Sequence, residues 1–249
     1  MKKNKFIIVF FFLLSLITYS QNIFHYSYFV KGEVREGVLL YDKNIDQAVY
    51  VDLLSTTKKT QKTEDKKIKE DVVAVITART TVADRFFYKK ENKLKFTQGL
   101  LKTMYLVDDE TLEINWKLDK IEKEIEGLKC QRATTQFRGR EWEVWYTTEI
   151  PMYYGPWKFY GLPGLIVLAK ENNNEFWFKL ERTETKNKVD IPVVNVKDYK
   201  RVTLQEFDKD ESEIMEGKDG IASRNYNEEI KPYKRNGVEL IYEWEEENK

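Results

Sequence analysis

The sequence predicts a mainly β, α+β fold, in which an antiparallel sheet carries one packed amphipathic helix. In several short stretches, apolar and charged residues alternate with a period of two. Such alternation places apolar side chains on one face of a sheet and charged ones on the other. Turn-forming residues separate these stretches, and one-sided alternation in successive strands is typical of antiparallel sheets. Helical spacing is sparse along the chain.

The clearest alternation is at 112–118, where Leu112, Ile114, Trp116 and Leu118 alternate with polar residues. Similar patterns at 142–146 and 176–180 predict two more strands. The remaining expected strands are 24–30, 37–41, 85–89, 128–137 and 165–170. Glycine, proline and asparagine turns near 127, 139, 155 and 172–174 separate them.

One amphipathic helix is expected at about 204–216. Thr203 and Glu206 have the spacing of a capping box, in which each side chain accepts a hydrogen bond from the other residue's backbone. Gly217 is a plausible helix stop. The apolar face of this helix is expected to contain Leu204, Phe207, Ile214 and Met215.

The first twenty residues have the order of a secretory signal peptide. Lys2, Lys3 and Lys5 precede an apolar run at 6–17, and we expect cleavage after Ser20. An uncleaved membrane anchor is the alternative. No cysteine lies near the cleavage site, so a lipoprotein anchor is not expected. After cleavage, the mature chain is not expected to span a membrane. We expect residues 21–249 to form a single exported β-rich domain, in the periplasm or on the outer-membrane or extracellular side.

Charge argues against a nucleic-acid partner. The whole chain has a formal charge of 0, and the three leader lysines leave 21–249 at −3. Phosphate binding requires a net basic surface. The stretch 57–71 mixes many lysines with acids and has hardly an apolar residue. It predicts a solvated loop, with a basic interaction patch as the alternative.

The sequence lacks the residues that several kinds of catalytic site require. The chain has one histidine, His25, and one cysteine, Cys130. Histidine-based or thiolate-based zinc sites, nucleotide-phosphate loops and nucleophile elbows are therefore not expected. We expect no catalytic residue, metal or cofactor. His25 is expected to be an exposed strand residue, and Cys130 a buried one, with an intermolecular disulfide or a reactive thiol as alternatives.

Carboxylates remain numerous. Glu141, Glu143 and Glu149 lie beside aromatic residues, as acids do in sugar-binding sites, or else they form the polar face of a strand. A carbohydrate-binding or carbohydrate-processing role would use Glu143 or Glu149 beside Trp145 and Trp157. A calcium site is possible, although no EF-hand spacing is present.

Four motifs follow one another in the central segment. They read Gly-Leu-Lys-Cys at 127–130, Phe-Arg-Gly-Arg at 137–140, Trp-Tyr-Thr-x-Glu-Ile-Pro at 145–151, and Gly-Pro-Trp-Lys-Phe-x-Gly-Leu-Pro-Gly-Leu-Ile at 155–166. This order resembles the GLPGLI family, exported proteins of Bacteroidota whose biochemical role is not established. The signature hexapeptide is matched in full by Gly161, Leu162, Pro163, Gly164, Leu165 and Ile166.

The resemblance covers roughly 117–178. The run Asn-Gly-Val-Glu-Leu at 236–240 departs from the Asn-Pro-Ile-Glu ending that the resemblance implies. The layout of strands, helix and aromatic residues also resembles the curved half-barrel of periplasmic lipoprotein carriers. That resemblance implies a curved, half-barrel-like sheet with an apolar concavity able to hold acyl chains or a peptide.

Two sharp turns bracket 157–160, because proline fixes φ and glycine permits positive φ. The resulting aromatic corner is either a structural corner, with Trp157 and Phe159 in the core, or a binding surface. The binding surface would be lined by Trp145, Tyr146, Tyr153, Tyr154, Trp157 and Tyr160.

The leading hypothesis is a non-enzymatic envelope protein that binds a hydrophobic ligand or a protein partner through this corner. The ligand or partner would be a lipid, a peptide or an envelope protein. The carbohydrate role is the second hypothesis, and a purely structural envelope interaction module is the third.

Overall fold

The computed structural model describes residues 21–30, 32–53, 85–91, 93–109, 113–186, 191–192, 195–216 and 233–246. The expected signal peptide at 1–20, the charged loop at 57–71 and the helix stop Gly217 lie outside these residues.

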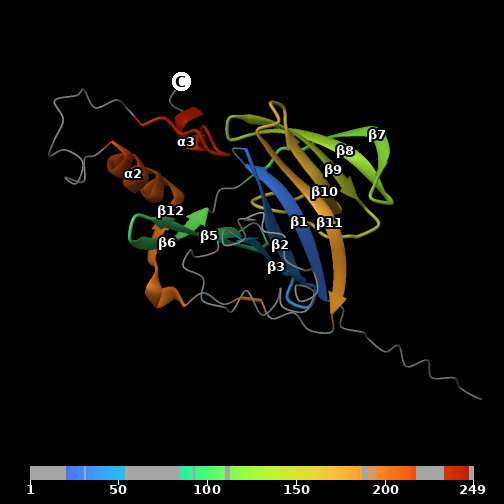
Figure 1. The fold of residues 1–249 in the computed structure, drawn as a ribbon, viewed down its shortest axis with the longest axis horizontal. Helices are drawn as coiled ribbons and strands as arrows, with labels where there is room; N and C mark the ends of the chain where they lie inside the picture. Colours follow the sequence, from blue (N-terminus) through green and yellow to red (C-terminus); the bar gives the residue numbers. More distant parts are fainter. Residues whose placement is uncertain are drawn as a thin grey trace, which may run out of the picture.

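The described strands form one open twelve-stranded sheet (Figure 1). From one edge to the other, its order is β12 (Lys200–Thr203), β6 (Thr103–Asp109), β5 (Lys93–Leu100), β4 (Arg85–Lys90), β3 (Gln47–Leu53), β2 (Glu33–Asp42), β1 (Gln21–Val30), β11 (Phe176–Lys186), β10 (Leu165–Glu171), β9 (Arg140–Thr147), β8 (Leu128–Phe137) and β7 (Lys117–Ile125). Every neighbouring pair is antiparallel except β12 and β6, which are parallel. The predicted mainly β, antiparallel fold is confirmed.

The sheet curls so that its two ends meet. In Figure 1 the strands around β6 run at a steep angle to β1 and β11. One core cluster contains Phe96 of β5, Trp142 of β9 and Phe178 of β11. Asp109 at the end of β6 is 2.7 Å from Arg138, which lies in the turn between β8 and β9. A flat sheet would keep these strands far apart, since neighbouring strands are about 4.8 Å apart.

Most of the expected strand at 112–118 is not a strand in the described residues. Residues 113–116 have no strand pairing, and β7 begins only at Lys117. Trp116 instead donates its Nε1–H to the carbonyl of Tyr160, at 2.8 Å. Leu118 is 54% exposed because β7 is an edge strand with one neighbour. Residues 113–116 therefore alternate with a period of two although they lie outside any strand.

Four strands, β3, β5, β6 and β12, were not predicted at all, and β7 was predicted only at Lys117 and Leu118. β3 shows why. Ala48 and Tyr50 belong to the core cluster on one face, whereas Val49 and Val51 belong to a second cluster on the other. A strand covered on both faces has no polar side, so the one-sided alternation is absent.

The predicted helix is α2 (Leu204–Met215), and its capping box is present. Thr203 N–H donates to Glu206 Oε2 at 2.8 Å, and Glu206 N–H donates to Thr203 Oγ1 at 3.2 Å. Leu204 and Phe207 are buried as expected, but Met215 is 55% exposed because it falls off the stripe that faces the sheet. A short 3-10 helix, η1 (Val196–Asp198), and α3 (Glu243–Glu246) complete the described helices. None of the helices described is long and apolar enough to cross a membrane.

Cys130 is buried in the core, as predicted. Burial, with a smaller contribution from Glu149, raises the pKa of its thiol to about 11. The prediction for His25 was wrong, since its side chain is only 12% exposed. Burial, together with the charges of Arg182 and Lys186, lowers the pKa of this imidazole to about 4.

We expect Cys130 to react slowly with a thiol reagent in the native protein. At pH 8, labelling should be on the order of 100-fold slower than in denaturant, because a raised pKa leaves little thiolate. The measurement is colour release from an aromatic disulfide reagent with and without guanidinium chloride. Equal rates in the two conditions would contradict the burial of Cys130.

Candidate functional site

The corner loop connects β9 to β10 and is closed by backbone hydrogen bonds. Phe159 N–H donates to the carbonyl of Pro156 at 3.0 Å, and Gly155 N–H donates to the carbonyl of Phe159 at 2.9 Å. Gly161 N–H then reaches the carbonyl of Tyr153 at 2.7 Å. Trp157 adopts a left-handed φ of 48°, which tertiary packing must hold in place. The turns expected from the sequence therefore form a compact loop.

Two glycines of the motif are required by close approach. A Cβ at Gly164 would lie 2.0 Å from the carbonyl oxygen of Thr147, an atom of the backbone. A Cβ at Gly155 would lie 2.5 Å from Cδ1 of Ile166. The loop thus lies directly against the strands that it connects.

Trp157 and Phe159 belong to the aromatic core. Trp157 stacks on Phe178 with ring centroids 6.2 Å apart and planes at 9°. Phe159 meets Trp142 edge-on at 4.9 Å and Trp157 at 5.1 Å. Phe159 is fully buried, and Trp157 is 6% exposed. This arrangement is what the structural alternative predicted for these two residues.

The other predicted site residues do not gather around Trp157. Trp145 is buried beneath the ammonium of Lys123, which lies 3.7 Å from the ring centroid. Because alternate residues of a strand point to opposite faces, Trp145 lies on the other face of β9 from Trp142. Tyr146 is buried on the Trp142 face, where its hydroxyl donates to Gln131 at 2.8 Å.

Three tyrosines complete that set. Tyr154 is buried and donates its hydroxyl to the carbonyl of Asp46 at 3.0 Å. Tyr160 is half-buried, and Tyr153 is 62% exposed. Of the six residues predicted, only Trp157 lines the pocket described below.

A buried lysine, which sequence reasoning missed, holds the corner loop from β4. Lys89 donates its ammonium to the carbonyl of Phe159 at 3.1 Å and also to that of Gly155. Burial lowers its pKa well below the usual value. The Phe159 carbonyl also accepts the hydrogen bond from Gly155 N–H that closes the 155–159 turn, so Lys89 helps to fix the position of Trp157.

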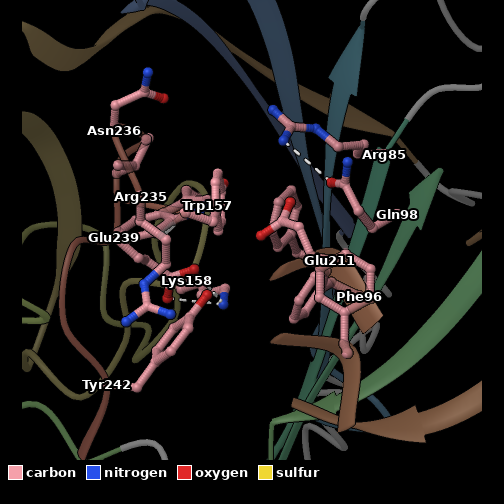
Figure 2. A pocket seen from close by; sticks show the side chains of 15 residues that line it. Arg85, Phe96, Gln98, Trp157, Lys158, Glu211, Arg235, Asn236, Glu239 and Tyr242 are labelled. Atoms are coloured by element: carbon pink, nitrogen blue, oxygen red, sulfur yellow. Dashed lines mark hydrogen bonds and ion pairs between the residues drawn. The ribbon is translucent and has the colours of Figure 1, made fainter. Parts of the chain in front are cut away.

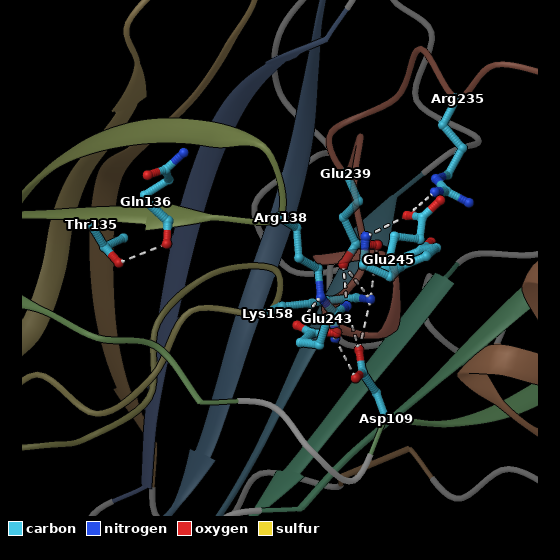
Figure 3. A network of polar contacts seen from close by, with 10 residues as sticks. Asp109, Thr135, Gln136, Arg138, Lys158, Arg235, Glu239, Glu243 and Glu245 are labelled. Carbon is cyan, nitrogen blue, oxygen red and sulfur yellow. Dashed lines mark hydrogen bonds and ion pairs between the residues drawn. The ribbon is translucent and has the colours of Figure 1, made fainter. Parts of the chain in front are cut away.

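A buried ionic network lies beside the loop (Figure 3). Arg138 binds Asp109 with two hydrogen bonds of 2.7 and 2.8 Å, and Lys158 donates to Asp109 at 2.9 Å. These three side chains are each only 1% exposed. Glu239 accepts from Lys158 at 2.9 Å and also pairs with Arg138, while Glu243 accepts from Arg138 Nε at 2.9 Å.

The charges of this network outweigh the cost of burial. Burial alone would raise the pKa of Asp109, but Lys158 and Arg138 lower it to about 2. Burial alone would lower the pKa of Arg138, but Glu239 and Asp109 raise it further above its usual value. Asp109 and Arg138 are therefore both charged at neutral pH.

The network also fastens the C-terminal segment at 233–246. Leu240 N–H donates to the carbonyl of Arg138 at 2.9 Å, and Arg140 Nη2 donates to the carbonyl of Gly237 at 2.8 Å. The cations of the Phe-Arg-Gly-Arg and Gly-Pro-Trp-Lys-Phe motifs thus bind this segment. Its Glu239 is the glutamate of the Asn-Gly-Val-Glu run at 236–239.

A pocket of about 310 Å³ lies between the C-terminal segment, the corner loop, α2 and strands β4 and β5 (Figure 2). In Figure 2, Trp157, Lys158, Glu239 and Tyr242 line one side, and Arg85, Gln98, Phe96 and Glu211 the other. Its aromatic lining consists of Phe87, Phe96, Trp157, Phe207, Tyr233 and Tyr242. Its charged lining consists of Arg85, Lys158, Glu211, Arg235 and Glu239. The pocket is therefore aromatic and charged at once.

The acids considered for a sugar site lie elsewhere. Glu143 accepts from Trp145 Nε1 at 2.8 Å and pairs with Arg132, whereas Glu149 accepts from Lys129 N–H at 3.0 Å. Neither lines the pocket beside Trp157. Across the described ranges, no group of three or more histidine, cysteine or acidic side chains is placed to hold a metal ion.

A family model described as "Protein of unknown function (Porph_ging)" matches residues 138–168. The match runs from the Arg138 turn through β9 and the corner loop into β10. It is consistent with the resemblance to the GLPGLI family. No curated protein matches the chain.

The chain is also similar to solved structures. PNGF-II, in its P21 and C2 crystal forms, gives TM-scores of 0.51 and 0.49 at 12% identity, covering 76% of this chain and 32% of PNGF-II. An uncharacterized conserved protein from Thermus thermophilus gives 0.40 at 8% identity, covering 75% of this chain and 91% of that one. This chain spans about a third of the PNGF-II length. At these identities, the PNGF-II match above 0.5 shows a shared fold alone.

We expect Asp109→Asn to lower the free energy of unfolding by about 3–5 kcal/mol at pH 7, because it leaves Arg138 and Lys158 buried without their shared carboxylate. The folded pKa of about 2 is depressed, so the stabilisation is present above the unfolded pKa and is lost as pH falls through about 2. Urea unfolding at pH 7 and at acidic pH measures both effects.

Asp210→Asn is the matched control for Asp109→Asn. Asp210 pairs with Lys200 at 2.6 Å, and the lysine side chain is 52% exposed. Loss of an exposed pair should cost about 0–1 kcal/mol. Equal effects of the two substitutions would contradict the role given to Asp109.

We expect Gly164→Ala to destabilise the protein by about 3 kcal/mol or to prevent folding, because the added Cβ overlaps the Thr147 carbonyl. Gly237→Ala is the control, since a Cβ there meets no atom within 4 Å. That change should alter stability by no more than about 1 kcal/mol. Thermal unfolding compares the two variants, and a fully stable Gly164→Ala would refute the close approach.

Proposed function

We propose that this chain is an exported, non-enzymatic binding protein whose ligand enters the pocket beside Trp157. The observation that carries the proposal is the pocket itself, a concavity whose lining combines aromatic rings with a few charged groups. The pocket shares its aromatic walls and convergent polar groups with small-molecule sites, although its lining is richer in charge than theirs. Its volume of about 310 Å³ is at the lower end of their range, which begins at about 300 Å³.

The corner motif supports a binding role by the way it is fixed. Trp157 and Lys158 line the pocket, Lys89 holds their turn from β4, and Asp109 and Glu239 hold Lys158. Binding groups locked by packing and hydrogen bonds lose little freedom when a ligand arrives. The proposal moves the binding surface from the whole aromatic corner to one of its residues, Trp157, and to its neighbours in the pocket.

Two charged groups of the pocket are held in fixed positions, which supports a binding role. Lys158 and Arg235, which line the pocket, are each held by two carboxylates. Such pairing fixes both side chains in place before a ligand arrives, which reduces the freedom lost on binding. Export is proposed on the strength of the leader at 1–20.

The carbohydrate alternative has less support, since Glu143 and Glu149 bind other groups and lie outside the pocket. Trp157→Ala would not separate binding from folding. Its ring is packed in the core, and removing such a ring costs about 3–5 kcal/mol.

We expect Gly237→Leu to block the pocket while leaving the fold intact. Gly237 lines the pocket, a Cβ there meets nothing within 4 Å, and its φ lies outside the left-handed region. The probe is N-phenyl-1-naphthylamine, a neutral aromatic dye that fluoresces in apolar surroundings. Filling part of a small pocket should weaken binding of the dye by about tenfold or more.

Val34→Leu is the control, because Val34 is exposed on β2 and does not line the pocket. It should leave dye affinity unchanged. Failure of the wild-type protein to bind the dye, or equal binding by Gly237→Leu, would reject the pocket as the site. Native mass spectrometry of protein purified from its own periplasm tests independently for a carried ligand.

A further inference from the structure

One carboxylate of the pocket occupies an apolar position of α2. Leu204, Phe207, Glu211 and Ile214 follow one another at spacings of three, four and three residues, which is the spacing of a single helix face. Leu204 and Phe207 are buried in the core, and Ile214 packs against it. Glu211 therefore points where a large apolar residue would normally pack, and both it and Phe207 line the pocket.

Glu211 differs from the other charged groups of the pocket in its partners. Arg85 is bound by Asp52, Arg235 by Asp208 and Glu245, and Lys158 by Asp109 and Glu239. Glu211 is hydrogen-bonded to Tyr233, and within the described part of the chain it has no cation within 4.0 Å.

The charges around the pocket are unbalanced toward acid. The ion pairs that include a lining residue, together with Glu211, involve six carboxyl groups and four cations among the described residues. The carboxyl groups are Asp52, Asp109, Asp208, Glu211, Glu239 and Glu245. The cations are Arg85, Arg138, Lys158 and Arg235. An excess of two formal negative charges remains, which a cationic ligand would reduce.

Burial makes the charge of Glu211 costly. Desolvation, reinforced by the like charge of Asp208, raises its pKa, while Arg235 opposes the change. A half-buried acid with a raised pKa is destabilising in its charged form, and a nearby cation removes that cost. Aromatic rings beside it add to the attraction, because a cation is drawn to the face of an aromatic ring. The site already shows such contacts, with Lys158 4.2 Å from the Phe96 centroid and Arg235 4.4 Å from that of Tyr242.

We infer that the pocket takes an organic ammonium group, with Glu211 as its counter-ion and the rings of Phe207, Tyr233 and Trp157 around its alkyl chain. This inference rests on the proposed function and names the chemistry of the ligand. An alkyl ammonium can come from a free amine or from a lysine side chain of a peptide. Both sources present the same cation at the end of an apolar chain, which matches an acid surrounded by rings.

The test compares cations with neutral molecules of the same shape, as displacers of N-phenyl-1-naphthylamine. The free-amine arm uses n-pentylammonium against n-pentanol. The peptide arm uses Nα-acetyl-lysine N-methylamide against the same compound acetylated at Nε. We expect the cation of at least one arm to bind about tenfold more tightly than its neutral match, as a charge-assisted contact provides. The arm with the tighter cation identifies the source.

Glu211→Gln and Glu213→Gln form a matched pair on α2. Both remove one carboxylate charge, but Glu213 is exposed and does not line the pocket. Glu211→Gln should reduce the cation preference to less than about twofold, while Glu213→Gln should keep it near tenfold. Because burial favours the neutral form of residue 211, Glu211→Gln should unfold in urea no earlier than the wild type.

The outcomes separate the two proposals. If the dye binds but cations and neutral molecules displace it equally, the ammonium inference fails and the binding function stands. A cation preference that survives Glu211→Gln also overturns the inference. If the wild-type protein does not bind the dye at all, the proposed function fails, and the inference fails with it.

Discussion

Asp109 lies at the end of β6, and its carboxylate binds Arg138 from the β8–β9 turn and Lys158 from the corner loop. These elements come from opposite ends of the twelve-stranded sheet. Charges this deeply buried are tolerated only when they are fully paired, and their pairing rarely adds stability over apolar packing. What the network supplies here is geometry. It fixes where the curled ends of the sheet meet, and with them the C-terminal segment that closes one side of the pocket.

The central motifs can be understood from this constraint. Glycines at 155 and 164 allow the corner loop to lie against β9 and β10 without overlap. Lys89 holds the same loop from β4 through two carbonyl groups, so the loop is fixed from both ends of the curled sheet. Trp157 is thereby locked between the aromatic core and the pocket. The region matched by the family model, 138–168, is thus the framework of the pocket more than its whole lining.

The helix α2 departs from the usual amphipathic pattern at the pocket for which binding is proposed. Glu211 places a carboxylate in the apolar stripe of α2, a choice that folding alone does not favour. Natural sequences accept such costs mainly at sites of binding or catalysis. Among the described residues, the neighbouring cations of this pocket are already paired, and a bound cation would resolve the local conflict.

The sequence by itself determined the elements whose signals are local. The bounds of β8 were predicted to the residue, and the capping box at Thr203 marked the start of α2. The close turns around 155–164 followed from glycine and proline chemistry. Strands covered on both faces, such as β3, carried no alternation to read, and the alternation at 113–116 belonged to a loop.

Which residues come together at the candidate site was decided only by the tertiary structure. Trp145 and Trp157 are near each other in the sequence, but Trp145 is on the face of β9 away from Trp142, against which Trp157 packs. Lys158 and Glu239 are 81 residues apart and form one ion pair. Periodicity reports which face of its own element a side chain occupies, whereas the meeting of distant groups depends on strand order and on the curl of the sheet. Neither is encoded within a window of a few residues.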